Sequence, residues 1–115
     1  MSVSASFKEF LIEQMAGFGP VTLRPMFGGA GVYHDGLMFA LVADEVLYLK
    51  VDDASRPAFI AENLPPFVYS RKDQKIDMSY FRSPERCMDD VDEMAIWCRT
   101  AYGAALNAAR KKPKK

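Results

Sequence analysis

Residues 24–53, RPMFGGAGVYHDGLMFALVADEVLYLKVDD, contain the strongest structural signals in the chain. The pair Asp35-Gly36 stands directly before an apolar segment at 37–43, and a second apolar segment follows at 46–51. Asp-Gly between such segments predicts a tight hairpin, because a type I′ turn needs positive φ at both of its central residues. The stretch therefore predicts antiparallel strands joined by short turns.

The residues before this stretch predict a helix and an edge strand. Ser6 and Glu9 have the spacing of a capping box, and apolar residues then recur at helical intervals, so a helix is expected over about 5–16. A strand is expected over 21–27. Pro25 cannot donate a ladder hydrogen bond, which places this strand at an edge of the sheet.

The second half predicts a helix, a hairpin and a longer helix. The short helix is expected over about 54–62, and the hairpin pairs 67–69 with 76–80 across a loop at 71–75. A run of acidic residues then precedes the apolar stripe of a third helix beginning near residue 91. The whole is a two-layer α+β fold with an antiparallel sheet and the element order α-β4-α-β2-α, in one domain over 1–109.

The segments 37–43 and 46–51 are too apolar for strands with one face in water. An antiparallel sheet exposed on one side alternates between apolar and polar residues, and these strands scarcely do. Either both sheet faces are covered within the chain, or another subunit covers the second face, with a second copy of the chain as one candidate. The residues expected at such a protein interface are Met38, Ala40, Val42 and Tyr48.

The charges are unevenly distributed along the chain. Residues 110–115 carry five of the fifteen cations, which leaves ten cations against fifteen acids in the rest. This segment is expected to be a disordered basic tail. The tail either is a solvated end that complements the dipole of the last helix, or it attracts nucleic acid. The loop at 71–75 is solvated, docks a protein or assists the tail in binding nucleic acid. The candidate nucleic-acid contacts are Arg71, Lys72, Lys75, Arg110, Lys111, Lys112, Lys114 and Lys115.

Four features that could carry chemistry favour structural roles instead. The glycines at 28–31 match neither dinucleotide nor Walker patterns and predict a turn or bulge. His34 is expected in solvent beside the hairpin turn, with no nucleophile placed near it. The acids at 89–93 lack the layout of a calcium loop and suit a helix start. Cys87 and Cys98 lack the spacing of a Cys-x-x-Cys redox motif or a zinc ribbon, and they are expected to be buried or reduced structural cysteines, with a regulatory disulfide as the alternative. No cofactor or metal is predicted.

The chain also resembles the TfoX N-terminal domain family of competence regulators over about residues 7–105. The matching stretches are Arg24-x-Met26-Phe27-Gly28-Gly29, Gly31-Val32-Tyr33, Asp35-Gly36-x-Met38-Phe39-Ala40, Leu47-Tyr48-Leu49-Lys50-Val51, Pro66-Phe67-x-Tyr69, Met78-Ser79-Tyr80 with Pro84, and the acidic start of the Trp97 helix. The resemblance implies a two-layer α+β domain. It also implies a role in promoting transcription of DNA-uptake genes, by assisting a cyclic-AMP receptor protein rather than by catalysis. Such regulators carry a second domain, so this chain is expected to be a single-domain member.

Together these observations predict a non-enzymatic regulatory or adaptor domain that acts through protein contact. The alternatives are a nucleic-acid-binding protein and, third, an enzyme or small-ligand-binding protein. The longest apolar run, 37–43, is too short to span a bilayer, and the N-terminus lacks the features of a secretion signal. A cytoplasmic location is therefore expected, without membrane contact.

Overall fold

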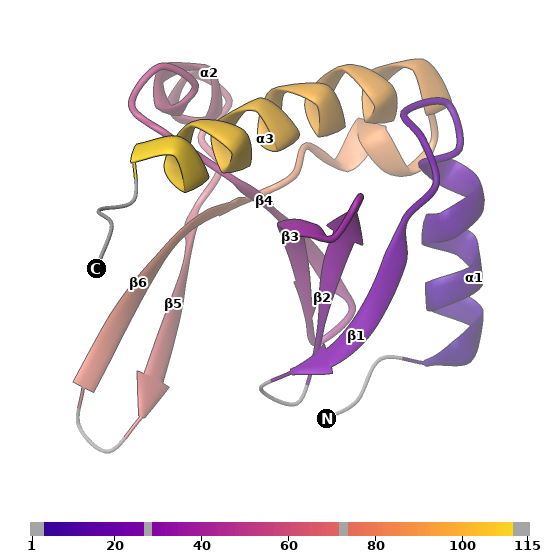
Figure 1. The fold of residues 1–115 in the computed structure, drawn as a ribbon, viewed down its shortest axis with the longest axis horizontal. Coiled ribbons are helices and arrows are strands. Elements are labelled where there is room, and N and C mark those ends of the chain that lie inside the picture. The colour runs from indigo at the N-terminus through magenta and orange to yellow at the C-terminus, as the bar shows by residue number, and fades with distance from the viewer. Residues whose placement is uncertain (1–3, 27–28, 72–73, 112–115) are drawn as a thin grey trace.

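The computed structural model describes residues 4–26, 29–71 and 74–111, with all side chains in these ranges except those of 68–71, 74–78 and 111. The elements follow the predicted α-β4-α-β2-α order, with one 3₁₀ turn added before the last helix (Figure 1). They are α1 (Ala5–Gln14), β1 (Thr22–Met26), β2 (Gly29–His34), β3 (Leu37–Ala43), β4 (Val46–Lys50), α2 (Arg56–Ala61), β5 (Pro66–Arg71), β6 (Gln74–Arg82), η1 (Glu85–Met88) and α3 (Val91–Lys111). The predicted α+β fold is confirmed.

All six strands form one antiparallel sheet in the order β1-β2-β3-β4-β6-β5. β1 lies at an edge, as Pro25 predicts. The predicted Asp35-Gly36 turn is also present, with φ of 51° at Asp35 and 79° at Gly36. Glycine adopts this φ without steric cost, which is why the pair marks the hairpin so clearly.

The three helices lie on one side of the sheet and share a single hydrophobic core with it. Figure 1 shows α3 crossing over the strands, α2 beside one end of α3, and α1 along the outer side of β1. The core joins Leu11 and Met15 of α1 and Phe59 of α2 to apolar residues of α3 and of the sheet: Met94, Cys98, Ala101, Ala105, Leu23, Val32, Ala40, Val42, Leu47 and Leu49. The opposite face of the sheet has no helix against it in the described chain.

Two rows of paired residues run across five strands and define the two faces of the sheet. The helix-covered row is Leu23, Val32, Ala40, Leu49 and Phe81. The neighbouring row, on the opposite face, is Arg24, Gly31, Leu41, Tyr48 and Arg82. Paired residues point to the same side of an antiparallel sheet, so the helix-free side carries an arginine at each end of this row.

Two irregularities interrupt the register of the sheet. One lies between β2 and β3, where Tyr33 pairs with Met38 but Val32 pairs with Ala40, which leaves Phe39 as an extra residue. The other lies in β6, where Ser79 has a φ of 58° beside a register shift with β5. Bulges increase local twist and bend the bulged strand.

Three sequence predictions need correction. The helix N-cap is Ser4, whose Oγ accepts a hydrogen bond from the Phe7 amide, so Ser6 and Glu9 form no capping box. The carboxylate expected from Glu9 comes instead from Glu45 in the β3–β4 turn, which accepts from the Ser4 amide at 3.1 Å. The helix ends at Gln14 rather than residue 16.

The other corrections concern loops that are partly strand. Gly29 and Gly31, predicted to lie in a turn, belong to β2, while residues 27 and 28 lie outside the described chain. Arg71 ends β5 and pairs with Gln74, and Lys75 pairs with Ser70, so three of the five residues of the predicted loop are strand residues; residues 72 and 73 lie outside the described chain.

The junction between β4 and α2 is tied to α3 through Asp52. Its Oδ1 accepts from the Ser55 amide at 2.9 Å, and its Oδ2 accepts from Asn107 Nδ2 at 3.1 Å. Ser55 Oγ in turn accepts from the Asp52 amide at 3.0 Å. The Asn107 hydrogen bond is the main reason that the pKa of Asp52 lies below its usual value, although partial burial acts in the opposite direction.

Candidate functional site

The structure divides the four predicted interface residues between the two faces of the sheet. Ala40 and Val42 are 0% and 1% exposed and belong to the core under the helices. Met38 and Tyr48 are half-buried on the helix-free side. The bulge at Phe39 causes the division, because it places Met38 on the opposite side from Ala40 despite their even spacing. An interface role for Met38 and Tyr48 stays a prediction.

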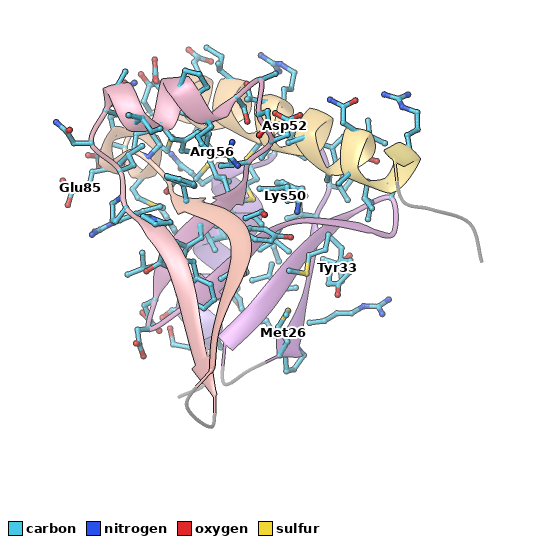
Figure 2. All side chains as sticks on the ribbon, turned by 90° about the vertical axis from the view of Figure 1, so that its left-hand side faces the viewer. Met26, Tyr33, Lys50, Asp52, Arg56 and Glu85 are labelled. Atoms are coloured by element: carbon cyan, nitrogen blue, oxygen red, sulfur yellow. The ribbon has the colours of Figure 1, made fainter. Side chains whose placement is uncertain are left out.

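We call the side of the sheet away from the helices the helix-free face. Its described residues combine methionines, aromatic rings and cations: Arg24, Met26, Gly31, Tyr33, Met38, Leu41, Tyr48, Lys50, Phe67, Tyr80 and Arg82. Figure 2 shows Met26, Tyr33 and Lys50 one above another, below α3 and beside the β5–β6 hairpin. The face is therefore built by several strands that are far apart in the sequence.

Two cation–ring pairs organise this face. The Arg24 guanidinium lies over the Tyr33 ring at 5.3 Å from its centroid, and the Lys50 ammonium lies over the Tyr80 ring at 5.2 Å. Such distances allow a cation–π attraction. Each pair joins two neighbouring strands, β1 to β2 and β4 to β6.

Two interactions on this face reach across non-adjacent strands. The rings of Tyr48 and Phe67 are 4.9 Å apart although β6 lies between their strands. Burial raises the pKa of Tyr80 to about 12, and Tyr33 adds to this shift although β3 and β4 separate the two. Tyr80 is only 6% exposed. Side chains from non-adjacent strands thus interact on this face.

Gly31 lies on this face beneath the side chains of its neighbours. A Cβ at Gly31 would lie 2.9 Å from Sδ of Met26, 2.9 Å from Sδ of Met38 and 3.1 Å from Cε1 of Tyr33. The absence of a side chain at this position is what lets the two thioethers approach the strand. Thioethers are flexible and polarizable, so this part of the face can adapt its shape to an apolar group.

The predicted nucleic-acid contacts fall at the ends of elements. Arg110 lies in the last turn of α3 and donates from Nη2 to Asn107 Oδ1, and Lys111 ends the helix. The predicted boundary between domain and tail therefore falls inside α3. Arg71 and Lys75 belong to β5 and β6, and the remaining candidates, Lys72, Lys112, Lys114 and Lys115, lie outside the described residues.

His34 is not in solvent as predicted, because its side chain is only 18% exposed. Its Nδ1 donates to the Pro20 carbonyl at 2.7 Å, and its ring packs against Phe18 and Tyr102 at centroid distances of 4.8 and 5.0 Å. Nε2 lies 3.5 Å from a carboxylate oxygen of Asp35. These contacts tie the loop after α1 to β2 and α3, which is a structural role.

Arg86 forms a second polar cluster at the helix side. Its guanidinium donates to both carboxylate oxygens of Glu62 at 2.8 Å and to Glu93 at 2.8 Å, and it lies over the Trp97 ring. The hydrogen bonds from Arg86 lower the pKa of Glu62. An open depression of about 590 Å³ adjoins this cluster. Because Arg86 is already held by two carboxylates, it has little capacity left for an anionic ligand.

The acidic run and the cysteines have the structural roles predicted for them. Asp90 caps α3, since its Oδ1 accepts from the amides of Asp92 and Glu93 at 2.9 and 3.3 Å. Within the described ranges no group of His, Cys, Asp and Glu could hold a metal ion. Cys87 and Cys98 are free and buried, and burial raises the pKa of each thiol to about 12. Both are therefore protonated at neutral pH.

A comparison with protein families decides what kind of domain this is. The sequence matches the model of the TfoX N-terminal domain over residues 13–105, from the end of α1 into the last turns of α3. The chain belongs to the TfoX N-terminal domain family. This confirms the resemblance inferred from the sequence, and it makes the protein a domain like that of the competence regulators. No curated protein matches the chain.

In this TfoX N-terminal domain, the resemblance motifs and the candidate site coincide in part. Arg24, Met26, Tyr33 and Lys50 lie in the motifs that carry the resemblance, yet sequence reasoning gave them no binding role. The sequence pattern that could have indicated these residues is the alternation of side chains in β1, where Arg24 and Met26 face away from Leu23, and in β4, where Tyr48 and Lys50 face away from Leu49.

None of the helices in the described ranges is both long and apolar enough to cross a membrane.

Proposed function

We propose that this member of the TfoX N-terminal domain family is a non-enzymatic regulatory domain of the cytoplasm that acts by binding a protein through its helix-free face. The observation that carries the proposal is the composition of this face. It combines tyrosines, methionines and arginines on a face of the sheet that no helix covers in the described chain (Figure 1). Protein interfaces are enriched in these residue types relative to the remaining surface.

Two further points support regulation rather than catalysis. His34, the only histidine, is engaged by a carbonyl and two aromatic rings, and both thiols are buried and protonated. The family relationship supports a regulatory role in transcription by analogy. The expected partner is accordingly a component of the transcription machinery, and two reduced cysteines suit a cytoplasmic protein.

The test is an affinity capture from native lysate with matched surface variants. Met38→Gln places an amide on the helix-free face, while Ile96→Gln makes the same kind of change on α3, where Ile96 is half exposed. Each variant is used with and without nuclease, beside the full chain and a chain ending at Ala109. Circular dichroism and thermal melting verify that all variants fold.

A protein that is captured after nuclease treatment, retained by Ile96→Gln and lost with Met38→Gln would support the proposal. A partner lost with Ile96→Gln but kept by Met38→Gln would place the contact on the helix layer and contradict it. Enrichment that disappears with nuclease or with residues 110–115 would instead favour the alternative, electrostatic binding of nucleic acid through the tail.

A further inference from the structure

Arg24 is an exposed cation that the fold holds in position without an acidic partner in the described chain. Its guanidinium lies over the Tyr33 ring at 5.3 Å, and no carboxylate of the described residues forms an ion pair with it. Arg56 and Arg86, in contrast, are paired with acids of the chain. A stacked guanidinium keeps its edge free for a bidentate contact with a carboxylate.

The surroundings of Arg24 have the same sign of charge. Lys50 and Arg82 lie on the same face, and no described side chain that the strand register places there is acidic. The described acids occupy the helix layer and the turns instead: Glu9, Glu13, Asp35, Asp44, Glu45, Asp52, Asp53, Glu62, Glu85, Asp89, Asp90, Asp92 and Glu93. The charged side chains described on the helix-free face are therefore all cationic, whereas acids outnumber cations among those described in the helix layer and the turns.

The centre of the face is apolar. Tyr48 and Leu41 separate Arg24 from Arg82 in the paired row, and Met26 and Met38 close over Gly31 beside them. A ligand that fits this surface has negative charge to meet the arginines and an apolar group to contact the thioethers.

We infer that the helix-free face binds an acidic peptide segment of the partner protein, with one carboxylate on Arg24 and an apolar side chain over Met26, Gly31 and Met38. This inference rests on the proposed function and adds the chemistry of the partner. Burial of the apolar side chain contributes to affinity, and the cations of the face attract the acidic segment and fix its position.

Two other occupants fit the face less well. Single-stranded nucleic acid binds by stacking bases on exposed rings, but cations lie over Tyr33 and Tyr80, and Tyr80 is only 6% exposed. A second copy of the chain in a face-to-face, two-fold arrangement would place the cations Arg24, Lys50 and Arg82 of one copy against the same set of cations of the other. Charge complementarity thus favours an acidic protein segment.

The experiment uses two synthetic peptides and the full chain. One peptide alternates Glu with Leu and Phe, and the other has Gln at every Glu position. A single-stranded DNA oligomer is the third probe. Fluorescence polarisation measures affinity at low and high salt, and NMR shift changes of backbone amides and methionine methyls locate each probe on the protein.

The variants separate charge from hydrogen-bond geometry. Arg24→Gln removes the charge, Arg24→Lys keeps the charge but loses the planar fork, and Arg99→Gln makes the same charge change at an exposed site on α3. We expect Arg24→Gln to weaken binding of the Glu peptide about tenfold, the scale of one charge-assisted contact. Arg24→Lys has a smaller effect and Arg99→Gln has none.

The Glu peptide should shift the resonances of Met26, Tyr33 and Met38, with affinity that falls as salt rises. Equal binding of the Gln peptide on this face would overturn the acidic specificity while leaving a protein contact there intact. No binding of the Glu peptide, binding at another surface, or tighter binding of the DNA oligomer on this face would also overturn the inference. The proposed function itself fails only in the capture experiment, so the two failures are distinguishable.

Discussion

Asp52 connects three segments of the fold through one carboxylate. It caps the turn before α2 by accepting from the Ser55 amide, and it accepts from Asn107 of α3. In the structure α2 begins at Arg56, so Asp52 lies in the turn that precedes this helix. Sequence reasoning could not identify the contact with Asn107, because the two residues are 55 positions apart and meet only in the folded chain.

We expect Asn107→Ala to lower the free energy of unfolding at neutral pH by about 1 kcal/mol, the net worth of one hydrogen bond. The folded pKa of Asp52 is depressed, so its contribution is fully present above the unfolded value of 3.8 and is lost as pH falls through the folded pKa. The difference between wild type and variant should therefore shrink below pH 3.8.

Urea denaturation over a pH series measures this difference. Thr100→Ala, which changes an exposed polar residue in the same helix, is the matched control and should show no such pH dependence. A difference between wild type and Asn107→Ala that stays constant into strong acid would show that the Asp52 carboxylate is not its source.

Local signals predicted the elements well, whereas their detailed pairing depends on the whole sheet. The Asp35-Gly36 turn and the edge position of β1 follow from the φ preferences of glycine and proline, which act within a few residues. The bulge at Phe39 has no such signal, because Met38, Phe39 and Ala40 are all apolar and alternation cannot reveal an extra residue among them. For this reason the sequence pattern places Ala40 and Val42 on the same predicted interface as Met38.

The start of α1 offers a direct test between two N-caps. We expect Ser4→Ala to destabilise the protein by about 1 kcal/mol, because it removes the acceptor for the Phe7 amide. Ser6→Ala is the matched control and should change stability by about 0.5 kcal/mol or less, since Ser6 lies exposed within the first turn. Equal losses in the two variants, measured by urea denaturation, would restore the capping box at Ser6.

Charge separates the molecule into two sides. The helix layer and turns carry most acids, and the described side chains of the helix-free face carry cations alone among charged groups. The family could be read from the sequence because its motifs lie in the strands. The candidate site could be read only in part. Met38 and Tyr48 were identified, but Arg24 acquires its role from Tyr33 on the neighbouring strand.

At this scale the charges predict how the chain associates with itself. A face-to-face pair would be opposed by repulsion between like cations, which salt screens. We therefore expect a monomer at low salt in sedimentation equilibrium, and any self-association through this face should strengthen as salt is added. A dimer that is tightest at low salt and is dissociated by Arg24→Glu would contradict the expectation that like cations on the helix-free face oppose self-association.

The hydrogen bond between Ser4 and Glu45 has a consequence for synthesis on the ribosome. The two residues are 41 positions apart, so the amide at the start of α1 lacks this partner until the β3–β4 turn has been translated. A helix of ten residues is marginal alone in water. α1 thus becomes fully ordered only after the β3–β4 hairpin has left the exit tunnel, so it completes its folding after this hairpin although it is translated before it.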